Sequence, residues 1–455
     1  MFLILNMKKI IISLHPLQKV LASFIVLILF GTFLLMIPLA THHGIGFIDA
    51  LFTSTSAVCV TGLIVLDTAA DFTFFGRMTI LFLIQFGGFG IMTFSLGLVS
   101  LLGRDLSVKW KYTLEGMYTD TGKVPIRSIL KRVIKYTFII ETATALILFS
   151  QFYHDFPLLK AIEHSVFHAV SAFCNAGFST FSDSLIRYQN NYIITASIAV
   201  AIILGGLGFI VLNEVSRFLY KKRTTRGRIP GLSIHTKIIL IMTVFLVVSG
   251  TIVFFILEWN NTLKGMNIFQ AVFTSAFQSV TCRTAGFNTV DIARLRESTL
   301  FMMIGLMFIG GSPGSIAGGI KTTTMFVIFM LIYTKFKGRK TVTVWGRSLD
   351  NETVDRSITL FILAIVFVSV ITFVILALHD SGGFSFLPVF FETVSAFGTV
   401  GLSTGITGRL PDLDKVILTV VMLTGRLGLL TVLMVFTLKK KKINLEYPRE
   451  HIMIG

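Results

Sequence analysis

The chain has 455 residues, of which 54% are hydrophobic and only 14% are charged. A soluble enzyme of this length needs far more polar surface, so the composition excludes one and predicts an all-α polytopic membrane protein. The formal net charge of +17 would also fit a nucleic-acid-binding protein. We expect no nucleic-acid partner, because the basic residues gather between selected apolar stretches.

Residues 1–18 carry Lys8 and Lys9 and lack the cleavage pattern of a signal peptide, so they are expected to form a cytoplasmic N-terminal segment. Beyond them, apolar stretches of about 20 residues, long enough to cross the lipid bilayer, recur along the chain. Examples are Leu21–Leu39, Ile193–Leu212, Ile238–Leu257 and Ile358–Leu378. Connections rich in Lys and Arg alternate with poorer ones. The positive-inside rule therefore predicts a multi-pass protein with both termini in the cytoplasm.

A pattern of apolar and small residues that ends in a glycine and a large apolar residue occurs four times. The four segments are Ile48–Leu63, Ile162–Phe178, Ile268–Phe287 and Leu387–Leu402. Their terminal glycines are 115, 109 and 115 residues apart, and a second small-residue cluster follows each one 24 to 28 residues later. Because the terminal glycine and the second cluster recur at nearly constant spacing, they indicate internal duplication.

Each of these segments is too short to cross a bilayer as a helix, since about 13 helical residues span only roughly 20 Å. Re-entrant backbone at membrane depth survives only inside protein or beside water. The expected fold is four tandem repeats of span, pore helix, filter strand and span, in a pseudo-fourfold arrangement around one pore. The expected boundaries are 19–103, 104–220, 221–337 and 338–438, followed by a cytoplasmic C-terminal tail over 439–455.

The four segments predict a selectivity filter for a monovalent cation. A dehydrated cation needs oxygens in place of its water, and four converging strands offer rings of backbone carbonyls. Glycine readily adopts the dihedrals that turn successive carbonyls the same way. The expected K+-binding residues, through their carbonyls only, are Val60, Thr61, Gly62, Asn175, Ala176, Gly177, Thr284, Ala285, Gly286, Thr399, Val400 and Gly401. The alternative is that these glycines merely let helices pack closely.

The third inner span is interrupted by five glycines and one proline within residues 310–319. Because each Gly costs a helix about 1 kcal/mol and Pro about 3 kcal/mol, we predict an unwound intramembrane gate loop over 310–322 below the filter. Its expected members are Gly310, Gly311, Ser312, Pro313, Gly314, Ser315, Gly318, Gly319 and Lys321. The alternative is a kinked helix, and Lys321 could instead face the cytoplasmic cavity.

Arg426 lies midway along the apolar stretch from Val416 to Leu438. A charge there costs at least about 2.5–3.5 kcal/mol on insertion scales, which indicates a function or a partner. We interpret Arg426 as a positive barrier that faces the pore beside the gate loop. The alternative is a structural ion pair, for which Glu141, another charge inside a predicted span, is the candidate.

Three acidic residues, Asp67, Asp183 and Asp291, follow the first three filter glycines. They would either attract cations at the outer mouth of a pore or serve as ordinary solvated loop carboxylates. Both readings stay open at the level of the sequence.

With these motifs in place, the chain resembles the Trk/Ktr/HKT superfamily of potassium transporters over nearly its whole length. The motifs that carry the resemblance are the four filter loops, the stretch from Gly310 to Thr322 and Gly425–Gly428 in the last span. Only about 47 residues precede the first pore helix. In this respect the chain resembles the Ktr-type membrane subunit (KtrB-like). Some relatives carry Ser at the first filter position and favour sodium, so the intact Gly62 supports potassium.

The resemblance implies a homodimer with one pore per subunit in a bacterial plasma (inner) membrane. It implies no cofactor on this chain, K+ as substrate and Na+ as an activator. It also implies a cytoplasmic ring of nucleotide-binding regulatory subunits (KtrA-like) that responds to ATP and ADP. The sequence itself carries no Gly-rich nucleotide-binding fingerprint, so a nucleotide would bind to the partner.

Two other function classes compete with a filter-based potassium pathway. A sodium- or proton-coupled secondary transporter would place ionisable residues near broken helices, as Glu141 and the third inner span do. Four parallel filter loops do not fit its usual inverted halves. An intramembrane enzyme would need a convergent nucleophile and base or a His cluster, and the sequence offers none. Channel-like and coupled transport through the same filter stay open.

Overall fold

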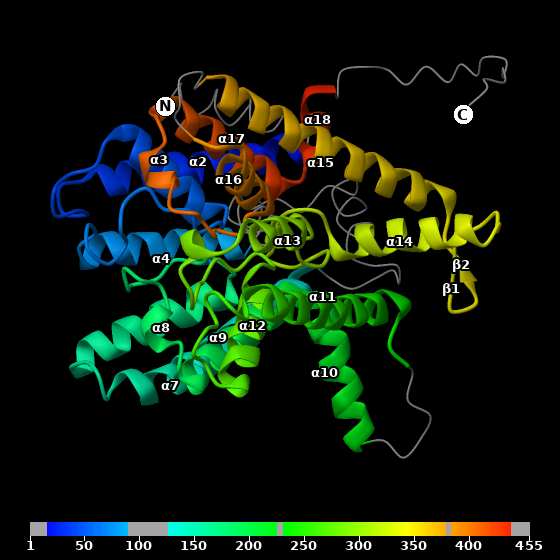
Figure 1. The fold of residues 1–455 in the computed structure, drawn as a ribbon, viewed down its shortest axis with the longest axis horizontal. Coiled ribbons are helices and arrows are strands. Elements are labelled where there is room, and N and C mark those ends of the chain that lie inside the picture. The colour runs from blue at the N-terminus through cyan, green and yellow to red at the C-terminus, as the bar shows by residue number, and fades with distance from the viewer. Residues whose placement is uncertain (1–15, 90–125, 225–230, 379–383, 438–455) are drawn as a thin grey trace.

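The computed structural model describes residues 16–89, 126–224, 231–378 and 384–437 (Figure 1). Four long helices, α2 (Pro16–Met36), α7 (Ile126–Phe152), α11 (Ile234–Glu258) and α15 (Asn351–Ala377), are apolar and long enough to cross a membrane. This confirms the predicted polytopic helical class. Most of the predicted segment 1–18 and all of the predicted tail 439–455 lie outside the described residues.

Each long helix is followed by a short helix that ends just before a filter glycine. These short helices are α3 (Phe47–Val58), α8 (Leu158–Phe173), α12 (Ile268–Thr281) and α16 (Phe386–Gly398). An inner span then follows: α4 (Phe74–Gly88), α9 (Tyr192–Leu207) with α10 (Phe209–Thr224), α13 (Glu297–Phe308) with α14 (Thr322–Phe336), and α17 (Asp412–Leu427) with α18 (Leu429–Thr437). The described chain thus gives the same order of elements four times.

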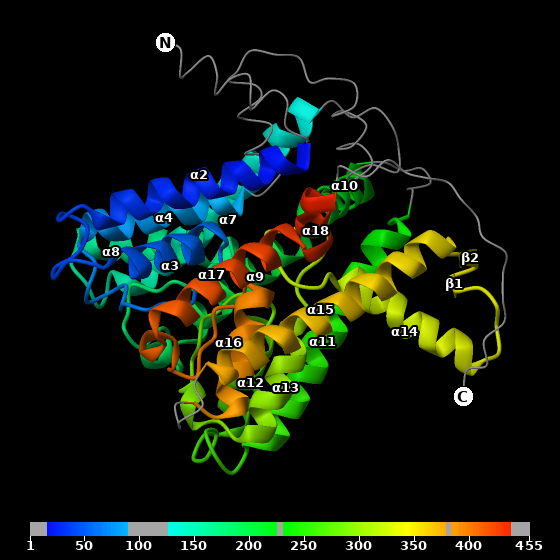
Figure 2. The same cartoon turned by 90° about the horizontal axis from the view of Figure 1, so that it is seen from above.

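The four units close into a ring. Within each unit the long helix packs on its own short helix, as α2 does on α3. Between units, α4 packs on α8, α9 on α12, α13 on α16, and α17 returns to α3. Figure 2 shows α2, α3, α4, α7 and α8 on one side and α11 to α16 on the other, with α9 and α17 between them. Most of the buried core divides in the same way, although Phe52, Cys59 and Leu63 of the first unit pack with the second-half cluster.

Large apolar side chains face outward on the long helices. On α15, Val366 is 52% exposed and Phe373 is 70% exposed. Such a surface is unfavourable in water but suits lipid tails, so these faces are the ones that contact the bilayer.

In the first, second and fourth units, the second small-residue cluster lets the inner span approach the end of its own short helix. A Cβ added at Gly87, Gly205 or Gly425 would collide with the carbonyl oxygen of Val58, Phe173 or Phe397, respectively. These three carbonyls belong to the last turn of α3, α8 and α16. The second landmark of the repeat is therefore a close-packing position beside the start of three of the four strands, whereas Gly310 of the third unit packs against Gly318 O instead.

The apolar stretch predicted over Ile193–Leu212 does not form one straight helix, because the chain bends by 104° between α9 and α10. Gly208 at the break has φ +84°, and Phe209 N–H donates to Gly314 O at 3.3 Å instead of continuing the helix. The stretch around Arg426 also breaks, at Gly428 with φ +87°. Both breaks lie on the side of the helix ring where residues 309–321 enter.

The remaining elements are short. Three 3₁₀ turns, η1 (Ile186–Tyr188), η2 (Ile292–Arg294) and η3 (Thr407–Arg409), precede α9, α13 and α17. A two-stranded antiparallel hairpin, β1 (Thr343–Val344) and β2 (Arg347–Ser348), pairs Thr343 with Ser348 and joins α14 to α15 at one end of the molecule (Figure 1). Val342 at the base of this hairpin packs with Val327 and Val354, so the turn is anchored to both helices.

Candidate functional site

The four strands predicted as a filter share one backbone conformation. The terminal glycines have positive φ, at Gly62 (91°), Gly177 (70°), Gly286 (78°) and Gly401 (90°). Two residues earlier a non-glycine also has positive φ, at Val60 (57°), Asn175 (57°), Thr284 (62°) and Thr399 (50°). The residues between them are Thr61, Ala176, Ala285 and Val400. Alternation of left-handed and extended backbone is the arrangement that turns neighbouring carbonyls to one side.

Each strand is tied back to its own short helix. Thr61 N–H donates to Ser56 O at 2.7 Å and Gly62 N–H donates to Ser56 Oγ at 3.0 Å. In the fourth unit, Val400 and Gly401 repeat both bonds to Ser395 at 2.8 and 3.1 Å. Because the N–H groups are satisfied on the helix side, the strand carbonyls are left to face the opposite side.

The four strands meet at their glycines. A Cβ added at Gly62 would lie 3.0 Å from Gly177 Cα. The same construction joins Gly177 to Gly286 at 2.9 Å, Gly286 to Gly401 at 3.3 Å, and Gly401 back to Gly62 at 2.9 Å. The ring of four is therefore closed, and the nearest atoms include carbonyl oxygens of the residues before the glycines. Such a ring of oxygens is suited to hold a dehydrated cation.

The predicted gate loop is unwound and lies under this ring. Gly310 N–H donates to Ile320 O at 2.8 Å, so the two ends of the loop run side by side. Thr322 N–H donates to Gly311 O at 3.1 Å and closes the same base. The predicted kinked helix is thus not what the chain forms: residues 309–321 are extended and turn backbone.

One side of the loop binds the second unit. Ser312 donates to Gly206 O from its N–H at 3.1 Å and from its Oγ at 2.8 Å, and its Oγ also contacts Leu207 O. Ser315 N–H donates to Ser312 O at 3.1 Å, with Pro313 and Gly314 in the turn between them. These bonds take up the carbonyls that α9 would otherwise use to continue as a straight helix.

The other side of the loop reaches the filter and the fourth unit. Gly318 N–H donates to Thr399 Oγ1 at 3.1 Å, and Gly319 N–H donates to Gly425 O at 3.3 Å. Lys321 Nζ donates to Ala317 O at 2.7 Å, so its ammonium group binds the loop itself. The hydroxyl of one filter residue is thus a direct anchor of the loop.

Arg426 is buried and bridges the loop to the first unit. Its guanidinium donates to Ile316 O in the loop and to Gly87 O on α4. Glu141, the alternative ion-pair partner, accepts from Gln85 Nε2 at 3.3 Å and lies 3.9 Å from Cys174 Sγ. Together with Ser312 and Gly319, Arg426 gives the loop contacts with the first, second and fourth units.

The outer acidic residues are engaged locally. Asp67 accepts from Ala69 N–H at 2.7 Å, Asp183 pairs with Arg187 at 3.0 Å, and Asp291 pairs with Arg294 at 3.1 Å. Asp67 accepts backbone N–H groups of its own turn, and Asp183 and Asp291 pair with arginines three or four residues further on, so these carboxylates serve as turn and cap residues. The ordinary loop role therefore fits them better than a cation-attracting mouth.

Sequence reasoning missed the buried polar side chains that fix the outgoing strands. Glu392 on α16 is only 1% exposed and accepts from Ser403 Oγ at 2.6 Å, Thr404 N–H at 2.9 Å and Thr407 Oγ1 at 2.7 Å. His168 on α8 contacts Ser179 Oγ at 3.0 Å in the corresponding place. The available signal was a polar residue nine positions before the filter glycine in both units, at Glu392 before Gly401 and at His168 before Gly177.

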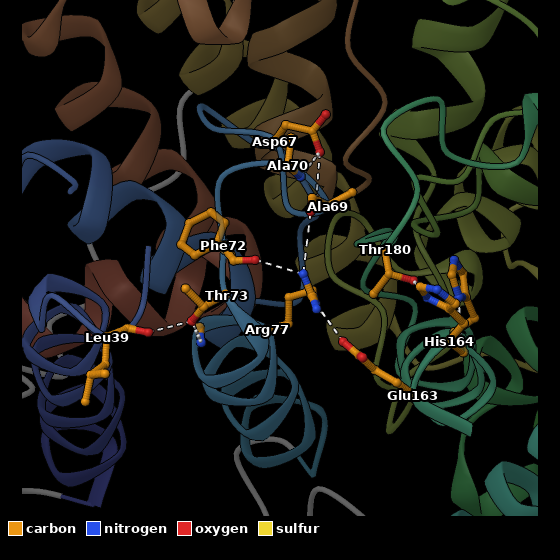
Figure 3. Close-up of polar contacts among 12 residues, drawn as sticks. Leu39, Asp67, Ala69, Ala70, Phe72, Thr73, Arg77, Glu163, His164 and Thr180 are labelled. Atoms are coloured by element: carbon orange, nitrogen blue, oxygen red, sulfur yellow. Dashed lines mark hydrogen bonds and ion pairs between the residues drawn. The ribbon is translucent and has the colours of Figure 1, made fainter. Parts of the chain in front are cut away.

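Ion pairs join neighbouring units on the outer side of the ring. Arg77 on α4 pairs with Glu163 on α8 at 2.7 Å and also donates to Phe72 O at 2.8 Å (Figure 3). Lys415 on α17 pairs with Asp49 on α3 at 2.7 Å. The first unit is therefore held by a buried or half-buried ion pair on each of its two sides.

Comparisons with known proteins agree with this architecture. The family model described as "TrkH: Cation transport protein" matches residues 6–446. The chain is 36% identical to the Ktr system potassium uptake protein B of Bacillus subtilis over 97% of both chains. It is 34% identical to the potassium/sodium uptake protein NtpJ of Enterococcus hirae over 97% of this chain and 98% of that one.

The fold is also similar to the crystal structure of the potassium transporter TrkH from Vibrio parahaemolyticus. The TM-score is 0.73 at 22% identity, covering 92% of this chain and 84% of that one. Repeated units, filter geometry and a match along almost the full length agree with the resemblance seen in the motifs, and they identify a transporter rather than an enzyme. The chain belongs to the TrkH family of cation transport proteins.

Proposed function

We propose that this protein takes up potassium across the plasma membrane through the ring of four filter strands. The observation that carries the proposal is the closed ring of Gly62, Gly177, Gly286 and Gly401, in which each glycine abuts the backbone of the next strand. Relatives named as potassium and potassium/sodium uptake proteins support the same cargo. The carbonyls beside these glycines replace the water of a dehydrated K+.

The test is cation flux into liposomes that contain the purified chain. Potassium, rubidium, sodium and lithium are compared at matched driving force, and we expect potassium and rubidium to be favoured. Equal or sodium-favouring flux would contradict the filter assignment. It would bring forward the rival, a sodium- or proton-coupled transporter.

The gate in this proposal is the loop over 310–322 together with Arg426. The loop runs directly under the filter, tied to Thr399 above and to α9 at its side. Flux requires that these bonds open, because an extended segment anchored to the filter stands in the path of the ion. Arg426 adds a positive charge that opposes a cation beside the closed loop.

Regulation in this proposal comes from outside the chain. Two subunits associate as a homodimer, each with its own pore, and a cytoplasmic ring of nucleotide-binding subunits controls the gate in response to ATP and ADP. Sodium acts as an activator. The name "Ktr system" carried by the relative from Bacillus subtilis supports a multi-component arrangement. Co-purification of the chain with such a ring, and flux with ATP or ADP added, tests this part separately from selectivity.

The proposed orientation places both termini and the hairpin β1–β2 in the cytoplasm. Lys335 lies in the last turn of α14, and Lys337, Arg339 and Lys340 lie between α14 and this hairpin, which supports that side by the positive-inside rule. The repeat boundaries proposed with it are 19–103, 104–220, 221–337 and 338–438. Cysteine accessibility at positions 337 and 445 checks the orientation.

A further inference from the structure

The third filter loop differs from the others by one residue. Cys59 and Cys174 stand three positions before Gly62 and Gly177, whereas Cys282 stands four positions before its glycine, Gly286. In the other loops the residue with positive φ itself donates its N–H back to the short helix, as Val60 does to Ala57 O at 3.1 Å. In the third loop Arg283 makes that bond, to Val280 O at 3.0 Å, and Thr284 adopts the positive φ.

The inserted residue is a buried cation. Arg283 is only 7% exposed, and its Nε is buried without a hydrogen-bond partner. Across the described ranges of the chain, no carboxylate pairs with its guanidinium and no carbonyl accepts from it. The small cavity beside it is lined by Ile202, Ile203, Gly206 and Val280, none of which carries a charge.

An unpaired guanidinium in such surroundings is costly unless its charge is used, since burial without a partner disfavours the charged group strongly. Arg426, which is also buried, is bound to two carbonyls. The charge of Arg283 has no neutralising partner and adjoins the strand Thr284–Gly286. Its field therefore reaches the ion sites of that strand with little screening.

We propose that Arg283 sets the potassium affinity of the filter by weakening cation binding at the end of the third strand nearest the gate loop. Conduction needs sites that bind an ion firmly enough to select it and weakly enough to release it. A fixed positive charge next to Thr284 destabilises an ion at that end. It thereby favours release toward the cavity beneath, where Gly206 O meets the gate loop.

This inference rests on the proposed function. It predicts a change in the half-saturating K+ concentration that is opposite in direction to the change expected from the loss of a structural arginine. Removing the charge tightens K+ binding, so the half-saturating K+ concentration falls and the maximal flux falls with it. For one unit charge on the order of 10 Å away at an effective dielectric of about 20, the expected fall in half-saturating concentration is about tenfold. A merely structural arginine would, when removed, raise the half-saturating concentration or lose selectivity.

The experiment compares R283Q, R283M and R283K in liposome flux as a function of potassium concentration. R283M keeps the apolar stem without a buried amide, and R283K keeps the charge. R294Q is the matched control, because Arg294 is an exposed arginine whose side chain is 81% accessible. Half-maximal stabilisation of each purified variant against heating by K+ gives a second readout that needs no flux.

A lower half-saturating potassium concentration in R283Q and R283M, with R283K and R294Q near wild type, supports the proposal. Unchanged or raised values in variants that stay folded overturn it, and so does a shift that R283K shares with R283Q. Should the wild type fail to prefer potassium, the proposed function fails. The affinity shift is then still measured for whichever cation the protein carries, so the two failures are distinguishable.

Discussion

Single backbone positions decide whether the filter ring can close. Gly401 has φ +90°, and a Cβ there would lie 2.9 Å from Gly62 Cα and still closer to Thr61 O. Any side chain would therefore push two strands apart, in addition to the strain of a left-handed conformation. Gly405 has nearly the same φ, +88°, but its Cβ would meet nothing within 4 Å. A substitution at Gly405 therefore tests backbone strain alone, whereas the same substitution at Gly401 tests strain together with crowding.

We predict that Gly401→Ser reduces the preference for potassium over sodium several-fold while the protein still inserts and folds. The reason is the displaced carbonyl ring. The measurement is the ratio of rubidium to sodium flux in liposomes. Gly405→Ser is the control, expected to cost stability but leave the ratio unchanged. Full potassium preference in Gly401→Ser would remove Gly401 from the filter.

The hydroxyl of Thr399 accepts a hydrogen bond from the loop over 310–322, whereas its backbone belongs to the proposed filter. Val60 occupies the corresponding place of the first strand with φ 57°, so a β-branched apolar residue is compatible with that conformation. Thr399→Val is expected to keep selectivity and to raise basal flux roughly fivefold. It deletes the hydrogen bond that Thr399 Oγ1 accepts from Gly318 N–H, which is worth about 1 kcal/mol. Lost selectivity with unchanged flux would place the hydroxyl in the filter instead.

At the scale of elements, the gate loop was predictable and its effect on neighbouring helices was not. Five glycines and a proline predict an unwound segment, because their low helix propensity depends on these residues themselves and not on distant partners. The breaks at Gly208 and Gly428 depend on the partners that the loop brings, such as Gly314 O for Phe209 N–H. A hydropathy pattern reports only apolar length, so the stretch Ile193–Leu212 gave no sign of the bend between α9 and α10.

We predict that deleting Ser312–Ala317 raises cation flux in the absence of any regulatory partner. The deletion removes the bonds of Ser312 to α9 and of Ile316 to Arg426. Flux of rubidium into liposomes is measured for the deletion and for Arg426→Ala, which releases the same loop from the other side. Wild-type flux in both variants would take the loop and Arg426 out of the gate.

At the scale of the whole molecule, ion pairs stabilise the seams on either side of the first unit. Arg77 and Glu163 are 18% and 10% exposed at their side chains and lie 2.7 Å apart (Figure 3). Leaving one partner of a buried pair alone typically costs about 3–5 kcal/mol, whereas replacing both by apolar residues is often nearly neutral. The apolar stretches and repeated clusters of the sequence do not predict this pairing, because the partners are 86 residues apart.

We therefore predict that Glu163→Leu lowers the melting temperature in detergent clearly, and that adding Arg77→Leu recovers part of the loss. Glu352→Leu is the matched control, since the Glu352–Arg356 pair is exposed and worth little. Arg77→Leu alone is measured as well, and melting of the wild type, the two single variants and the double variant by tryptophan fluorescence gives the coupling energy. Additive losses in the double variant would show that the two side chains act independently.

Because one polypeptide forms the whole ring, substitutions affect the evolution of this pore differently from that of a pore built from identical subunits. Where four identical subunits build a filter, every substitution enters four times and each carbonyl layer must tolerate all four copies. Here Val60, Asn175, Thr284 and Thr399 occupy equivalent places with different side chains, and the third strand carries an extra residue. Each quarter of the pore is free to specialise singly, so the third strand can adjust ion release, as we propose for Arg283, while Thr399 of the fourth strand anchors the loop.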